Sequence, residues 1–258
     1  MHFVHLTFVR GSAILNLSNE REVINLLKID RRKNYMIVLD CETAPCDRTL
    51  EDVIPINMLA YDVGWVVVDR NGIVYEKRSF VVADIFLDEK ELMQSAYYAS
   101  KIPEYWADIK QGSRILTSFY KIRKQLIEDV ETYGVKQIYA HNMRFDYGSL
   151  NNTERWLTKS KYRFFFPYGV EICDTLKLAR QLIATMSTYQ KYCEDFGYMT
   201  KHKIPQPKLT AEIIYRFISG DECFEEEHKG LDDCMIEKEI LAYCYRKHKK
   251  MDGRLWAD

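Results

Sequence analysis

The chain has 258 residues and is 47% hydrophobic, which suits one sizeable domain with a buried core. With a formal net charge of −1, the chain has no overall charge that would hold it on nucleic acid or on a membrane. No apolar run is long enough to predict a membrane-spanning helix, and the seven cysteines contain no Cys-x-x-Cys pair. We therefore expect a cytoplasmic protein with free thiols.

Residues 1–34 differ in pattern from the rest and are predicted to form an extension of uncertain structure before a main domain at 35–250. The run 2–9 predicts a short strand. The run 19–29 predicts a helix, because Asn19 and Glu22 are spaced as a capping box.

The main domain begins with strand patterns. The apolar run 35–40 predicts a central strand covered on both faces, and Asn71-Gly72 predicts a hairpin between two β-rich runs. Helices are expected across 88–133, with a loop near Pro103 and Gly112.

Strand and helix patterns alternate in the second half. Strands are expected at 135–140 and 170–174, with Asp174 as the N-cap of the next helix. The expected helices lie at 145–157, 175–184, 188–196, 209–219 and 230–249. Strands first and alternation afterwards predict an α/β fold, with a mixed sheet and helices on both faces.

Asp40 and Glu42 follow the first predicted strand at a spacing of two, so their side chains point to the same side. Two adjacent carboxylates repel each other unless a cation lies between them. The apolar residues before Asp40 disfavour a solvated strand end, although metal binding and a solvated end both stay open at this point.

Two further aspartates lie on the inner faces of predicted helices. Asp146 shares a helical face with Leu150, and a favourable interaction with the helix dipole is the alternative to metal binding. Asp233 shares an apolar stripe with Ile236, where a carboxylate is costly unless it is paired or binds metal. Asp232 is expected to face solvent.

His228 lies five residues before Asp233, in the loop that leads into the last helix. A surface histidine in an acidic loop is the ordinary interpretation, but this spacing places the ring beside the same site. An imidazole with a pKa near neutrality suits a proton acceptor. Four carboxylates with such a base indicate hydrolysis of phosphodiesters with two cations.

The three clusters resemble, in order, the motifs of the DEDDh family of 3′→5′ exonucleases, which includes the proofreading epsilon subunit of DNA polymerase III, RNase T and oligoribonuclease. Asp-x-Glu-Thr matches 40–43, His-Asn-x-x-Phe-Asp matches 141–146, and His followed by Asp five later matches 228–233. The resemblance covers about residues 36–245. A family alanine is Gly230 here, a change that we expect to be tolerated.

The resemblance implies a ribonuclease H-like fold, a five-stranded mixed sheet flanked by helices, with 35–250 as the exonuclease domain. It implies that two Mg²⁺ or Mn²⁺ ions are held by four carboxylates and that His228 is the general base. The implied ligands are Asp40, Glu42, Asp146 and Asp233. The implied substrate is the 3′ end of single-stranded DNA or RNA, released as nucleoside 5′-monophosphates.

Thr43 and Asn142 are candidates for binding the terminal nucleotide. Local turn bonding is the alternative for Thr43, and orientation of the chain around Asp146 is the alternative for Asn142. His141 is interpreted as structural. Contacts of Lys201, Lys203 and Lys208 with backbone phosphate are a further option, although a solvated face is the more ordinary interpretation.

Other functions of the same fold also stay open. The alternatives are a proofreading accessory that is active mainly with a polymerase partner, and a catalytically silent module that binds nucleic acid. A homodimer is a further option for the assembly of the chain.

Overall fold

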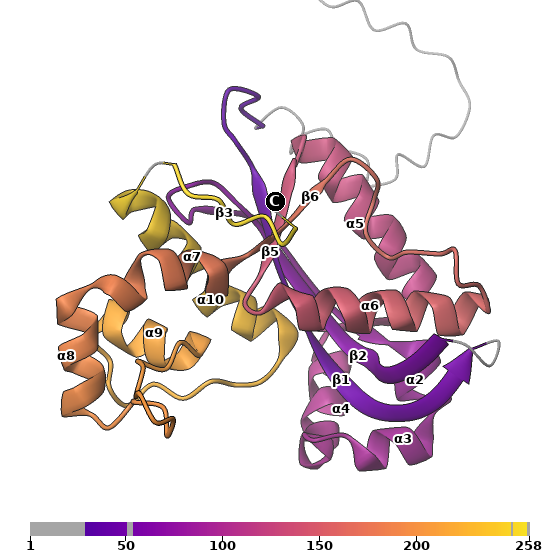
Figure 1. The fold of residues 1–258 in the computed structure, drawn as a ribbon. Helices are drawn as coiled ribbons and strands as arrows, with labels where there is room; N and C mark the ends of the chain where they lie inside the picture. The colour runs from indigo at the N-terminus through magenta and orange to yellow at the C-terminus, as the bar shows by residue number, and fades with distance from the viewer. Residues whose placement is uncertain (1–28, 51–53, 249, 257–258) are drawn as a thin grey trace, which may run out of the picture. The chain divides into compact units, whose positions relative to one another are not determined.

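The computed structural model describes residues 29–50, 54–248 and 250–256 (Figure 1). Contacts divide the chain into Met1–Arg32 and Lys33–Asp258, and everything below concerns the second unit. The strand expected at 2–9 and nearly all of the helix expected at 19–29 lie outside the described residues, so the extension stays a prediction. None of the described helices is long and apolar enough to cross a membrane.

The sheet has six strands in the order β4-β3-β2-β1-β5-β6. The antiparallel strands are β1 (Met36–Leu50), β2 (Ile54–Val68) and β3 (Val74–Val82). Strands β4 (Ile115–Thr117), β5 (Gln137–Ala140) and β6 (Glu171–Asp174) each run parallel to their inner neighbour. The mixed α/β class is confirmed. The sheet has one strand more than the expected five because short β4 extends the edge beyond β3.

The predicted hairpin is confirmed between β2 and β3. Gly72 in its loop has a φ of 80°, a left-handed conformation that glycine adopts at little cost. The expected end of the first strand near Asp40 is wrong, because β1 continues to Leu50 with β2 as its partner.

Helices occupy most of the positions that the pattern predicts. The helical segments are α2 (Ala83–Phe86), α3 (Lys90–Ser95), η1 (Ala99–Lys101), α4 (Ile102–Gln111), α5 (Phe119–Tyr133), α6 (Met143–Thr158), α7 (Thr175–Gln181), η2 (Ile183–Thr185), α8 (Ser187–Asp195), α9 (Ala211–Ser219) and α10 (Gly230–Lys247). The Asp174 side chain accepts a 2.8 Å bond from the Leu176 N–H, so the predicted cap is confirmed.

The loop expected near Pro103 is wrong. Pro103 lies in the first turn of α4, where its missing N–H leaves no helical bond unmade. Gly112 does end that helix, in a left-handed conformation with a φ of 79°.

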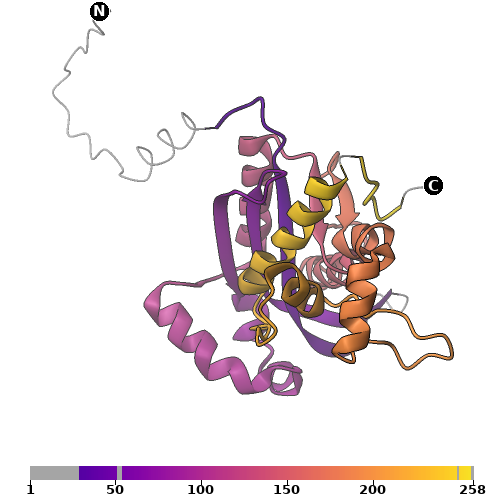
Figure 2. The ribbon, with the colours of Figure 1, turned by 90° about the vertical axis from the view of Figure 1, so that its left-hand side faces the viewer.

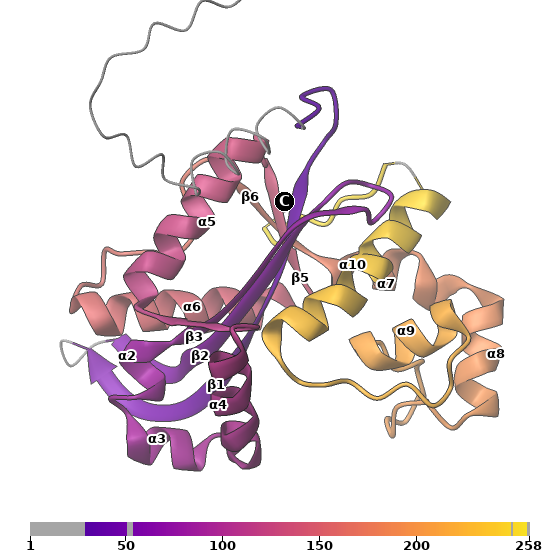
Figure 3. The same ribbon diagram turned by 180° about the vertical axis from the view of Figure 1, so that it is seen from behind.

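Helices cover both faces of the sheet, as Figure 1 shows. Helix α10 lies across one face together with α7 and α9, while α5 and α6 lie on the other (Figure 2). Helices α2, α3 and α4 lie around the C-terminal end of β1 and the N-terminal end of β2 (Figure 3).

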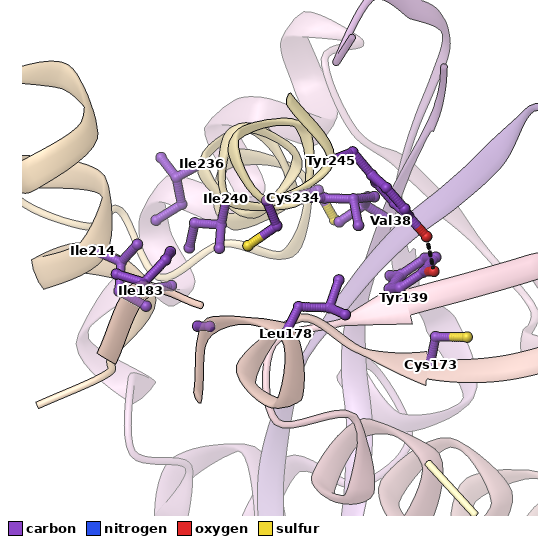
Figure 4. Close-up of a cluster of buried hydrophobic side chains, with 14 of the residues drawn as sticks. Val38, Tyr139, Cys173, Leu178, Ile183, Ile214, Cys234, Ile236, Ile240 and Tyr245 are labelled. Carbon is purple, nitrogen blue, oxygen red and sulfur yellow. Dashed lines mark hydrogen bonds between the residues drawn. The ribbon is translucent and has the colours of Figure 1, made fainter. Parts of the chain in front are cut away.

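The core beneath α10 fixes which way β1 faces. Met36 and Val38 of β1 pack in one buried cluster with Ile236 and Ile240 of α10 (Figure 4). Side chains alternate along a strand, so Asp40, two residues after Val38, faces the same layer. Packing of α10 on this cluster therefore brings the start of the helix toward Asp40.

Candidate active site

Asp40 and Glu42 lie within β1, directly after the residues that pair with β5. On its β5 side, strand β1 is paired at Ile37 and Val38. Beyond Val38, β1 keeps β2 as its partner and has lost its neighbour on the other side. The site therefore lies where the sheet splits, next to the starts of α6 and α10.

The start of α6 brings Asp146 to this split. Asp146 is 2% exposed, and its Oδ1 accepts bonds from the Cys41 N–H at 3.2 Å and the Cys41 thiol at 3.3 Å. Cys41 separates the two acids of β1, so these bonds hold Asp146 beside both. The predicted inward orientation of Asp146 is confirmed.

The start of α10 approaches β1 and β2 closely because two glycines face each other there. A Cβ added to Gly230 would lie 2.9 Å from the Gly64 nitrogen and 3.0 Å from the Asp40 carbonyl oxygen. A Cβ added to Gly64 would lie 2.2 Å from the Leu231 nitrogen. The contact therefore requires glycine at 230, and the family's alanine would not fit here without a shift of the helix.

This approach places Asp233 against the acids of β1. Ligand atoms of Glu42, His228 and Asp233 all lie within 4.8 Å of one another. Asp233 is 6% exposed, and its Oδ1 is buried without a hydrogen-bond partner among the described residues. Asp232 is half exposed and pairs with Arg114, so the predicted division between the two aspartates is confirmed.

An aromatic ring from another part of the chain holds His228 in place. The imidazole ring stacks on Tyr98, with centroids 4.6 Å apart and an interplanar angle of 15°. His228 itself has a φ of 47°, and Lys101 Nζ bonds the carbonyl of Glu227 just before it. The Nδ1 atom lies 3.8 Å from Glu226 Oε2. The segment Tyr98–Lys101 therefore fixes the loop that carries the histidine.

The pKa values of the acids are raised, chiefly by burial. Burial and the nearby Asp146 carboxylate raise the pKa of Asp40 well above its usual range. Burial raises the pKa of Glu42 to about 8 and that of Asp233 to about 9, and neighbouring carboxylates add to both. Burial raises the pKa of Asp146 to about 7, against the opposing bonds from Cys41. The raised values show that these acids are withdrawn from water and lie close to one another.

His228 shifts in the opposite direction. Burial and the positive charge of Lys101 lower the pKa of the imidazole below its ordinary value. The ring is therefore neutral at neutral pH and available as a proton acceptor.

Sequence reasoning missed a fifth acid of the cluster, Glu237. It is 3% exposed, and its Oε2 accepts a 3.1 Å bond from the His141 N–H. Its charge contributes to the raised pKa of Asp40. The signal was available, because Glu237 lies four residues after Asp233 and therefore on the same helical face.

Thr43 lies in an aromatic pocket of about 420 Å³ beside the carboxylates, lined among others by Glu42, Thr43, Met58, Tyr97, Tyr98 and Phe145. Asn142 lies elsewhere, because its side chain lines a separate cavity of about 800 Å³. The backbone N–H of Asn142 donates to Asp174 Oδ1 at 3.0 Å.

His141 has no free ring nitrogen. Its Nδ1 lies 3.0 Å from Thr175 Oγ1, and its Nε2 lies 2.6 Å from the Leu209 carbonyl. Burial lowers the pKa of this imidazole, so it is held neutral in a structural position.

No family model matches the sequence, and no curated protein matches it. Solved exonuclease structures are similar to the chain at low sequence identity. Exonuclease X, in complex with 5′-overhanging duplex DNA, is 15% identical over 84% of this chain and 95% of its own, with a TM-score of 0.41. A 3′-exonuclease that recognises the 3′ end of a histone mRNA stem-loop is 11% identical over 90% of this chain and 71% of its own, with a TM-score of 0.48.

The S. pombe protein Pop2p, in its Mg²⁺- and Mn²⁺-bound form, is 13% identical over 91% of this chain and 90% of its own, with a TM-score of 0.45. The function of this chain has to be inferred from its own residues.

Proposed function

We propose that the chain is a metal-dependent 3′→5′ exonuclease that acts on single-stranded DNA or RNA ends. One observation carries the proposal: carboxylates from β1, α6 and α10 converge, with Asp146 and Asp233 buried and the β1 acids half-buried. None of them forms an ion pair with lysine or arginine within the described part of the chain. A buried set of like charges is costly unless cations from outside neutralise it.

The donor set fits divalent ions of the magnesium type. All of these acids offer carboxylate oxygens, which Mg²⁺ and Mn²⁺ prefer, and Asp233 Oδ1 is a buried acceptor without a partner in the described residues. Asp40, Glu42, Asp146 and Asp233 would hold two such ions. When bound, the ions would polarise the phosphate and lower the pKa of water.

His228 would act as general base. Its neutral ring takes the proton of the attacking water as the water oxygen bonds to phosphorus and the P–O3′ bond breaks. The departing 3′ oxygen takes up a proton from solvent and becomes the new 3′ hydroxyl of the shortened strand. The released product is a nucleoside 5′-monophosphate. The stack on Tyr98 keeps the ring in position for each turnover.

The aromatic pocket would take the terminal nucleotide. Tyr97 is 86% exposed and Phe145 is 43% exposed, so both rings are accessible to a base. Stacking of a base on an aromatic ring is tolerant of sequence and contributes about 1–3 kcal/mol. Glu42 and Thr43 line the same pocket, which places a nucleotide bound there next to the carboxylates.

Adjacent aspartates provide a matched test. 5′-Labelled single-stranded DNA and RNA are incubated in Mg²⁺ or Mn²⁺ with wild type, Asp233→Asn, Asp232→Asn and His228→Ala. We expect a ladder that shrinks from the 3′ end and disappears in EDTA. Loss of metal stabilisation worth several kcal/mol predicts roughly a thousandfold lower rate for Asp233→Asn, while Asp232→Asn stays within a few-fold of wild type.

No cleavage by wild type in either metal would overturn the proposal and favour a silent binding module. Equal losses in the two aspartate variants would show that charge in general, and not the inner carboxylate, limits the rate.

A further inference from the structure

We propose that the 800 Å³ cavity lined by Asn142, Arg180, Thr200, Gln206, Lys208 and Thr210 binds the phosphate backbone of the substrate strand behind its 3′ end, an inference that rests on the proposed function. We call it the cationic cavity. The net charge of −1 gives the chain no general attraction for a polyanion, so a strand has to be held by a local positive feature.

The cavity lies beside the active site because both border the start of α6. Asn142 lines the cationic cavity, and Phe145 lines the aromatic pocket. The two residues are three apart at the helix start, about one turn of roughly 5 Å. Arg144 lies between them and is exposed. A strand whose last base occupies the aromatic pocket therefore passes this turn to reach the cavity.

The charges that line the cavity are of one sign. Arg180 and Lys208 are both exposed, and neither side chain forms an ion pair or hydrogen bond within residues 29–50, 54–248 and 250–256. No acidic residue lines the cavity. Lysines near the carboxylates differ in this respect, because Lys101 bonds the Glu227 carbonyl and Lys229 pairs with Asp108. Free cations with neutral donors such as Thr200 and Gln206 match a phosphodiester.

The wall that carries Lys208 is held in a fixed conformation. The Thr200 N–H donates to the Gln206 carbonyl at 2.8 Å, and the Gln206 N–H donates to Thr200 Oγ1 at 2.9 Å. The Lys208 N–H donates to the Tyr198 carbonyl at 2.9 Å. A preorganised wall loses less entropy when a strand binds. These bonds place Lys208 in the cavity, whereas Lys201 and Lys203 lie in the exposed turn beyond them.

The test measures binding without catalysis. Fluorescent dT12 is titrated in EDTA at 50–200 mM KCl with wild type, with Arg180→Gln/Lys208→Gln, and with Lys121→Gln/Lys124→Gln on α5 as the charge-matched control. The slope of log K against log salt is about −0.7 for each contact with a single-strand phosphate, so the slope of the cavity variant should be about 1.4 less negative than that of the wild type. We expect its affinity at 50 mM KCl to fall roughly tenfold, while the control keeps the wild-type slope.

A second readout is strand length. The advantage of dT12 over a dinucleotide in kcat/KM should shrink about tenfold in the cavity variant, because a dinucleotide is too short to reach the cavity. An unchanged salt slope, or the same change in the control, would overturn the proposal. Because binding is read in EDTA, a wild type that binds dT12 with the expected slope yet cleaves nothing would contradict the exonuclease and not the strand site.

Discussion

Two sets of inward-facing carboxylates lie in or against the same sheet and differ in their partners. Asp129 of α5 receives two bonds from Arg78, at 3.0 and 2.9 Å, and a third from the Trp65 indole N–H at 2.9 Å. Asp62 of β2 receives bonds from Arg114 at 2.6 Å and from the Tyr105 hydroxyl at 2.8 Å. Each of these acids has its cation supplied by the protein.

Within the described residues, the acids at the sheet split have no such partner. Asp40, Asp146 and Asp233 have other acids as neighbours. Their pKa values are raised by burial and by these neighbouring acids. A sequence position cannot reveal this difference, since all of these residues are inward-facing aspartates. The source of the counter-charge therefore separates the structural acids from those of the proposed metal site.

Removal of Arg114 gives the largest expected effect on stability. Arg114→Met leaves Asp62 buried and uncompensated, so the free energy of unfolding should fall by about 3–5 kcal/mol in urea titrations. Asp233→Asn in EDTA should cost little, because it removes a like charge and breaks no ion pair. Equal losses for the two variants would erase the difference between the two sets.

Dependence on pH and metal sharpens the same comparison. The raised pKa values of about 7 for Asp146, 8 for Glu42 and 9 for Asp233 lie above unfolded values near 4. The folded state therefore binds more protons over this window. The resulting stability is fully present below about pH 4 and is lost as pH rises through 7 to 9.

In EDTA, the Tm should accordingly fall from pH 6 to pH 9. Mg²⁺ or Mn²⁺ at one hundred times its Kd should add about 2.7 kcal/mol at pH 8. Asp233→Asn should lose most of that gain, and Asp232→Asn should keep it. A Tm that is flat with pH and insensitive to both metals would contradict the assignment of the cluster as a cation site.

The smallest expected effect concerns the stack on His228. Tyr98→Ala should lower kcat about fivefold, in line with an aromatic pair worth about 1 kcal/mol, and Tyr98→Phe should restore most of the rate. A loss confined to KM would instead assign Tyr98 to nucleotide binding in the aromatic pocket. Single-turnover kinetics at saturating substrate separate the two outcomes.

Local pattern predicted most of the elements and the inward faces of Asp146 and Asp233. It failed where the reason lies in distant neighbours. The strand was expected to end near Asp40 because the apolar run 35–40 stops there. Pro45 is tolerated because β1 has lost β5 on one side, which leaves an open edge where a missing N–H costs nothing.

The remaining misses share a cause. Tyr98 is 130 residues before His228 in sequence, and Arg114 is 52 residues after Asp62. Neither pairing has a local signature, because only the path of the chain brings the partners together. Glu237 was different, since its spacing from Asp233 was visible and only its role was not considered.

The glycine contact between β2 and α10 has a consequence for how this chain can change over generations. Gly64 and Gly230 meet backbone to backbone, so a side chain gained at either position moves the helix that carries Asp233. A substitution at either glycine alone would therefore displace the Asp233 carboxylate, which lies three residues after Gly230. We therefore expect that, among descendants of this chain, a replacement at one glycine is found together with a compensating change at the other.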